Sequence, residues 1–183
     1  SVGRNFIGGT AVTELTVPKT VTDMSYALYG AQNLRKVSFE AGMEKIPDGV
    51  LSAYSISDPR SGVQEVEIPE GVEIIGYYAF EDCDSLTKVT FPSTLTTIED
   101  RAFRYCDGLE GIEFPEGLKT IGTRAFTACS SLTEVELPGS VETLGDYAFE
   151  ECENLKEITL NDGLVSVGRN FIGGTAVTEL TVP

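Results

Sequence analysis

Four cysteines are the residues of this sequence best suited to do chemistry, as a disulfide, a metal site or a reactive thiol. They are Cys83, Cys106, Cys129 and Cys152, and each interval between them is 23 residues. Zinc sites usually pair ligands about two to four residues apart, so the spacing argues against a metal cluster. Cysteines on adjacent turns of a repeat would lie about 4.8 Å apart with parallel Cβ atoms, which disfavours a disulfide. We therefore expect a buried column of reduced thiols.

The composition excludes several classes of function. The 183 residues include 13 Lys and Arg, 29 Asp and Glu, no His and no Trp, which gives a net charge of −16. A nucleic-acid partner requires a basic face, and serine–histidine catalysis and histidine metal sites require histidine. The apolar runs are too short to insert into a membrane. We predict a protein that is not an enzyme and has no catalytic residues, no cofactor and no metal site.

The 23-residue spacing extends to other residue types, which identifies a tandem repeat. Within each unit, L-x-x-V-x-L-P alternates apolar and polar residues and predicts a short strand, and the proline ends it. The segment I-G-x-x-A-F-x-x-C-x-x-L predicts a compact return made of tight turns or of short 3₁₀ or helical pieces. Three further residue types keep the same step: Phe80, Phe103, Phe126 and Phe149; Leu86, Leu109, Leu132 and Leu155; Pro69, Pro92, Pro115 and Pro138.

The strand-like triplets predict a solenoid of about eight rungs, in which stacked units share one core. One insertion of about six residues separates the second and third rungs. The triplets are Leu15–Val17, Val37–Phe39, Val66–Ile68, Val89–Phe91, Ile112–Phe114, Val135–Leu137, Ile158–Leu160 and Leu180–Val182.

The phrase A-F-x-x-C-x-x-L-x-x-V-x-[LF]-P resembles the 23-residue leucine-rich repeat of BspA-type surface proteins. The likeness covers essentially all 183 residues and is strict from about residue 70 to 160. It implies a leucine-rich-repeat solenoid with a parallel sheet on its concave face. It also implies an extracellular setting on a bacterial or protist cell surface, with adhesion to host proteins. The chain departs from the pattern at Leu28 and Ala31, which replace Phe and Cys, and at residues 43–62.

Residues 166–183 repeat residues 1–18 without a change, 165 residues further along the chain. We expect residues 1–183 to form a single solenoid without evident caps, either as a fragment of a longer array or with an engineered end. Any signal or anchor is expected outside these residues. Because uncapped rungs expose a core and strand edges, we also expect end-to-end self-association.

The strand alternation places acidic residues on the predicted concave face. Adjacent rungs should stack like charges there, which destabilises a sheet. This face has two possible roles, namely binding cations or a basic partner, or serving as a solvated surface that discourages aggregation. The residues are Glu65, Glu67, Glu113, Glu134, Glu136, Glu157 and Glu179.

Two further regions have side chains suited to contacts. The insertion contributes Tyr54, Asp58 and Arg60, and insertions in solenoids form loops that either bind or are merely tolerated. The edge that precedes each A-F pair alternates tyrosine and arginine, the residue types common at interfaces. Its candidates are Tyr77, Tyr78, Arg101, Arg124 and Tyr147.

The sequence thus predicts a non-catalytic recognition or adhesion module that presents a rigid surface to a protein or glycan partner. The alternative is a structural fibre or stalk, or an engineered scaffold, that assembles through its terminal rungs.

Overall fold

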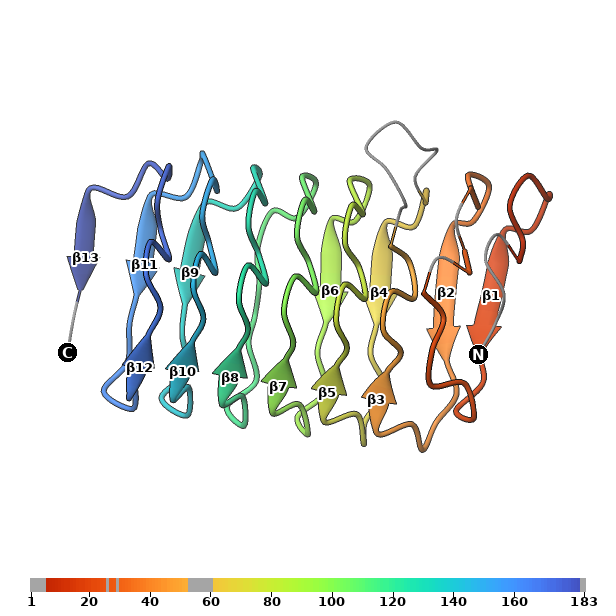
Figure 1. The fold of residues 1–183 in the computed structure, drawn as a ribbon, viewed down its shortest axis with the longest axis horizontal. Coiled ribbons are helices and arrows are strands. Elements are labelled where there is room, and N and C mark those ends of the chain that lie inside the picture. The colour runs from red at the N-terminus through yellow and green to blue at the C-terminus, as the bar shows by residue number, and fades with distance from the viewer. Residues whose placement is uncertain (1–5, 26, 29, 53–60, 182–183) are drawn as a thin grey trace.

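The computed structural model of the chain describes residues 6–25, 27–28, 30–52 and 61–181, and it is a solenoid of parallel strands joined by turns (Figure 1). No described residue lies in a helix. The strands are β1 (Glu14–Val17), β2 (Lys36–Phe39), β3 (Lys45–Ile46), β4 (Glu65–Glu67), β5 (Ile74–Ile75), β6 (Lys88–Thr90), β7 (Thr97–Ile98), β8 (Thr120–Ile121), β9 (Glu134–Glu136), β10 (Thr143–Leu144), β11 (Glu157–Thr159), β12 (Ser166–Val167) and β13 (Glu179–Thr181).

The first sheet follows the predicted strands and is interrupted once. Its parts have the orders β1-β2-β4-β6 and β13-β11-β9, and all pairs are parallel. The prediction is wrong at residues 112–114, which form no strand. Gly111 precedes them where β6 and β9 carry Lys88 and Glu134. A glycine has no side chain to pack on its neighbours and loses more entropy when it is extended, so the strand is weakest there.

A second sheet lies on the other side of the solenoid, with the order β12-β10-β8-β7-β5-β3. Its strands have two residues each, and the sequence analysis assigned those residues to the return. The overlooked signal was a recurring β-branched pair, as in Thr97–Ile98 and Thr120–Ile121, whose members lie in register. Ile98 and Ile121 are fully buried, so this sheet closes the core opposite the first one.

The return is built from tight turns, and in the described residues the helical alternative is wrong. Successive N–H groups alternate between two kinds of acceptor. Phe80 donates to the Ala102 carbonyl of the next rung at 2.7 Å, whereas Glu81 donates to the Tyr78 carbonyl at 3.1 Å. Tyr78 and Asp82 have φ values of 55° and 61°. This left-handed backbone costs a non-glycine residue about 1–2 kcal/mol, and it lets the return bond to its neighbour as a strand does.

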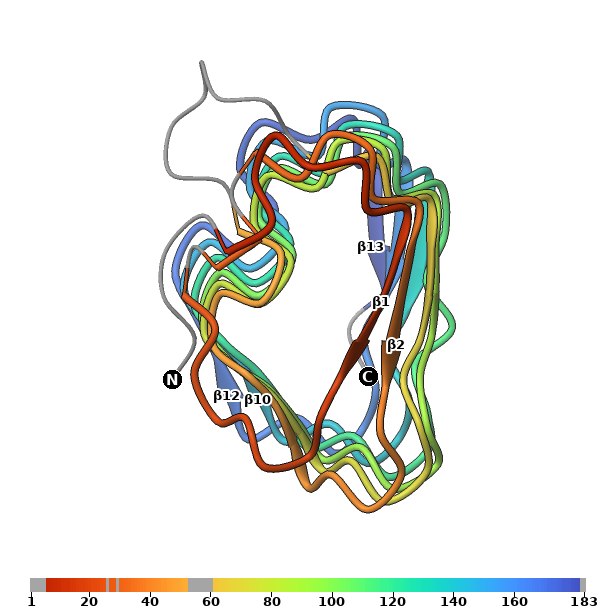
Figure 2. The same cartoon turned by 90° about the vertical axis from the view of Figure 1, so that its right-hand side faces the viewer.

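The phenylalanines form a continuous stack inside the solenoid. The ring centroids of Phe80 and Phe103 are 5.1 Å apart, those of Phe103 and Phe126 are 5.2 Å apart, and those of Phe126 and Phe149 are 5.3 Å apart. All four side chains are fully buried. Viewed along its long axis, the solenoid has rungs that lie over one another, which brings equivalent residues into columns (Figure 2).

The four cysteines form the expected buried column, and none of them forms a disulfide. The Cys106 Sγ donates to the Phe80 carbonyl at 3.1 Å, and the Cys129 Sγ donates to the Phe103 carbonyl at 3.2 Å. Burial raises the pKa of the Cys106 and Cys129 thiols above the ordinary value, so both are protonated at neutral pH. The prediction of reduced, apolar-like cysteines is confirmed.

Candidate functional site

Four residues at equivalent positions of successive rungs form an arginine–tyrosine column: Tyr78, Arg101, Arg124 and Tyr147. All four have φ between 55° and 61°. The backbone fixes the column, since the Arg101 N–H donates to the Thr123 carbonyl at 3.0 Å and the Arg124 N–H donates to the Asp146 carbonyl at 2.9 Å. The four residues thus share one backbone conformation, and each lies one rung further along the solenoid than the one before it.

Each arginine of the column contacts a tyrosine ring. The Arg101 guanidinium lies 5.3 Å from the Tyr78 ring centroid and donates to the Tyr78 hydroxyl. The Arg124 guanidinium lies 4.6 Å from the Tyr147 ring centroid, and Arg169 lies 5.2 Å from the same ring. These cation–π contacts hold long side chains in place, which lowers the entropy they would lose on binding.

A second column lies beside the first and joins rungs through aspartates. Asp48 Oδ1 accepts the Tyr77 N–H at 3.2 Å. Asp100 Oδ1 accepts the Thr123 N–H at 2.8 Å, and Asp146 Oδ1 accepts the Arg169 N–H at 2.9 Å. These carboxylates bind the backbone of the following rung, which makes them structural supports for the arginine–tyrosine column.

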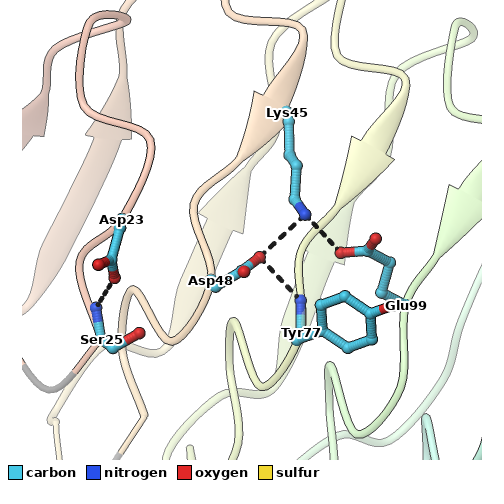
Figure 3. Close-up of polar contacts among 6 residues, drawn as sticks. All are labelled: Asp23, Ser25, Lys45, Asp48, Tyr77 and Glu99. Atoms are coloured by element: carbon cyan, nitrogen blue, oxygen red, sulfur yellow. Dashed lines mark hydrogen bonds and ion pairs between the residues drawn. The ribbon is translucent and has the colours of Figure 1, made fainter. Parts of the chain in front are cut away.

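Lys45 links three rungs next to Tyr77, as Figure 3 shows. Its Nζ is 3.0 Å from Asp48 and 2.6 Å from Glu99, and it lies 5.4 Å from the Tyr77 ring centroid. Burial opposes the charged form of Lys45, but the hydrogen bonds to Glu99 and Asp48 outweigh it and raise its pKa. The sequence analysis missed Lys45 because its partner Glu99 is 54 residues away.

Arg104, Tyr105 and Glu81 form another cluster that the sequence analysis missed. The Arg104 guanidinium lies 4.2 Å from the Tyr105 ring centroid and 3.3 Å from Glu81. Burial raises the pKa of Glu81 despite this ion pair. The available signal was Arg104, which directly follows the A-F pair of its rung.

The acidic residues of the first sheet stack as predicted in part of the chain. Glu157 is in register with Glu134 on one side and with Glu179 on the other. Glu65, in contrast, faces Lys88. Like charges in register destabilise a sheet and opposite charges stabilise it, so the acidic repulsion is concentrated at the C-terminal end.

An open groove of about 840 Å³ crosses this face where the first sheet is interrupted. Its walls include Glu110, Glu113 and Glu136, together with Phe91. Phe91 is half-buried, although the alternation placed it inside the core. Within the described ranges no group of three His, Cys, Asp or Glu side chains is arranged to hold a metal ion.

A profile of the BspA type Leucine rich repeat region matches residues 1–60 and 59–179, in six copies. The chain belongs to this family. BspA-type repeats therefore account for the columns, and proteins of the leucine-rich-repeat family are generally not enzymes. No curated protein matches the chain.

Solved structures agree with the fold of this BspA-type chain. It is similar to the T. pallidum leucine rich repeat protein, with 25% identity and a TM-score of 0.61 over 85% of this chain and 74% of that one. It is also similar in fold to the pneumococcal vaccine antigen PcpA, with 16% identity and a TM-score of 0.54, over 97% of this chain and 60% of that one. The BspA-type chain thus spans only part of each relative.

The remaining predicted contact residues of this BspA-type chain, Tyr54, Asp58 and Arg60, lie outside the described residues. Of the predicted edge residues, Tyr77 and Tyr78 are the most open, with 43% and 37% of their surface exposed. The described residues include no helix that is long and apolar enough to cross a membrane.

Proposed function

We propose that this chain is an extracellular or cell-surface adhesion module that binds a protein through the arginine–tyrosine column and the adjacent Tyr77. The observation that carries the proposal is the arrangement of Tyr78, Arg101, Arg124 and Tyr147, which stack in four successive rungs. Tyrosine and arginine are enriched in the residues that dominate binding energy. The membership in a repeat family whose surfaces commonly bind proteins supports the same function.

The contrast with the rest of the surface supports this choice. The net charge is −16, and the first sheet carries stacked glutamates, which are depleted at interface cores. The arginine–tyrosine column instead places cations and rings side by side on a backbone held by inter-rung hydrogen bonds. A rigid surface of this kind loses little conformational entropy when it binds. The column thus provides contact area at a small cost in conformational entropy.

A binding survey tests the proposal. The 183-residue chain is immobilised and exposed to a panel of purified extracellular proteins, and each hit is measured again with two double variants. We expect Tyr78→Ala/Tyr147→Ala to weaken binding by about tenfold or more, because truncating a hot-spot residue costs about 2 kcal/mol. The matched variant Glu134→Gln/Glu136→Gln on the first sheet should bind as the parent does. Equal binding by the tyrosine variant would overturn the proposal.

A second candidate function is self-assembly, and the repeated segment favours it. Because residues 166–183 copy residues 1–18, β13 has the same sequence as the part of β1 that pairs with β2. The last rung also exposes apolar side chains, with Val165 at 84%, Val167 at 46% and Leu180 at 41%. We propose that residues 1–183 act as one solenoid, and that β13 can pair with β2 of a second copy once residues 1–18 of that copy are displaced.

Light scattering and negative-stain microscopy test the self-assembly proposal. Strand exchange should give linear oligomers that grow with concentration, and Leu180→Lys should weaken them because a charge would pack against the core, where the equivalent Leu15 is half-buried. Lys119→Gln, which alters the exposed surface in the middle of the solenoid, should leave them unchanged. A monomer at every concentration would exclude strand exchange.

A further inference from the structure

We propose that Arg101 and Arg124 together bind a carboxylate, supplied by an aspartate or glutamate side chain of the protein partner. This inference rests on the proposed function, because it names the chemistry that the arginine–tyrosine column would recognise. The two arginines occupy the same position in adjacent rungs, whose backbones are hydrogen-bonded at this point. Their rungs are therefore about 4.8 Å apart, which is close enough for one anion to contact both guanidinium groups.

The surrounding carboxylates are already engaged by other groups. Glu99 pairs with Lys45 at 2.6 Å, and Asp100 accepts the Thr123 N–H at 2.8 Å. Glu81 pairs with Arg104 at 3.3 Å, and Asp146 pairs with Arg169 at 2.9 Å. Each of these four acidic side chains thus has a closer described partner than either arginine of the column.

Arg101 and Arg124 themselves have no ion-pair partner within 4.0 Å among the described residues. Arg101 donates to the Tyr78 hydroxyl, and its Nε is a buried donor without an acceptor in the described part of the chain. The adjacent positions therefore hold two positive charges that form no ion pair among the described residues, although the Arg101 charge is near enough to Glu81 to favour its ionised form. Like charges at adjacent register positions repel, and an anion between them would remove that repulsion.

The shape of the column favours a carboxylate on a protein. Guanidinium groups bind carboxylates through paired, nearly parallel hydrogen bonds, and such bonds are about twice as strong as neutral ones. Tyr78 and Tyr147 close the two ends of the column, so a bound carboxylate would be flanked by aromatic rings rather than by solvent alone. A partner segment with one acidic side chain beside apolar ones fits this arrangement.

Arginine side-chain NMR tests the inference on the intact 183-residue chain. The probe is a synthetic peptide with a glutamate at its centre, compared with the same peptide carrying glutamine. We expect the glutamate peptide alone to shift the Nε–Hε signals of Arg101 and Arg124 saturably. Arg101→Gln and Arg124→Gln should each weaken binding by about tenfold, the value of one charge-assisted hydrogen bond. The affinity of Arg124→Lys should be intermediate, because lysine keeps the positive charge but lacks the planar guanidinium group.

Two controls make the outcomes decisive. Lys119→Gln removes an exposed positive charge elsewhere, and this variant should bind the glutamate peptide as the parent does. A loss of affinity equal to that of the arginine variants would show that net charge alone attracts the peptide, and it would overturn the inference. Binding of the glutamine peptide with the same affinity would also overturn it. So would binding of heparin without any binding of the glutamate peptide, since the site would then take a sulfated glycan.

The proposed function can fail separately. If Tyr78→Ala/Tyr147→Ala weakens binding of a protein partner and Arg101→Gln/Arg124→Gln does not, the column is a contact surface and the carboxylate inference is wrong. If neither double variant changes partner binding, both are wrong.

Discussion

The same 23-residue spacing gives two opposite surfaces in this molecule, the acidic first sheet and the arginine–tyrosine column. On the sheet, Glu134 and Glu157 lie in register, so a like charge faces a like charge. In the column, Arg101 contacts Tyr78 and Arg124 contacts Tyr147. Equivalent positions of a solenoid lie side by side, so a repeated charge is unfavourable unless a compatible group lies next to it, as a tyrosine ring lies next to each arginine of the column.

The two surfaces also rest on different parts of the core. Phe103 and Phe126 stack beneath the return that bears the column, with centroids 5.2 Å apart. The first sheet instead buries single β-branched residues such as Val135, which is 3% exposed. The column therefore rests on more buried apolar surface than the first sheet does. The first sheet also carries the repulsion between stacked glutamates.

The largest expected effect comes from removing that support. Phe126→Ala should lower the free energy of unfolding by about 3–5 kcal/mol, because it leaves a cavity in a fully buried stack. Val135→Ala beneath the first sheet should cost only about 2 kcal/mol. Urea unfolding followed by circular dichroism measures both. Equal losses in the free energy of unfolding would mean that both surfaces depend on the same part of the core.

A smaller effect is expected within the column itself. Tyr147→Ala removes the ring that contacts both Arg124 and Arg169, and it should lower the free energy of unfolding by about 1–2 kcal/mol. Tyr147→Phe retains the ring and should stay close to the parent. If both variants lose the same stability, the tyrosine hydroxyl rather than the cation–π contacts stabilises the column. Thermal unfolding of the three proteins distinguishes these results.

The smallest expected effect has the opposite sign. Glu157→Gln should raise the free energy of unfolding by about 0.2–1 kcal/mol, because Glu157 faces Glu134. Glu65→Gln should lower it slightly, because Glu65 faces Lys88. Both changes should shrink in high salt, which screens exposed charges. A gain in stability from both variants would indicate net charge as the cause, and the register would then be irrelevant.

Much of the fold followed from the sequence, because the spacing of Phe and Cys sets the rung and stacks equivalent side chains. The second sheet was missed because a two-residue strand such as β7 is too short to show alternation. The break at residues 112–114 was missed because Ile112 and Phe114 keep the strand pattern intact. Gly111 was the one residue that indicated this break, because glycine disfavours an extended strand through its backbone and not through its hydrophobicity.

The candidate site was predictable in composition and less so in its contacts. The position of Tyr78 and Arg101 one repeat apart indicated that they would be neighbours. Lys45 could not be placed in the same way, since its contact with Glu99 skips a rung and depends on the reach of two long side chains. Periodicity predicts contacts between equivalent positions, and contacts between unlike positions require the coordinates.

Hydroxyl-radical footprinting of the chain bound to a protein partner from the binding survey tests the central claim most directly. Tyr77 and Tyr78 are 43% and 37% exposed, and aromatic side chains report their own exposure through oxidation. We predict that the partner protects Tyr77, Tyr78 and Tyr147 from oxidation and leaves Phe91, in the groove of the first sheet, unchanged. Protection of Phe91 without protection of the tyrosines would place the partner on the acidic sheet and contradict the account.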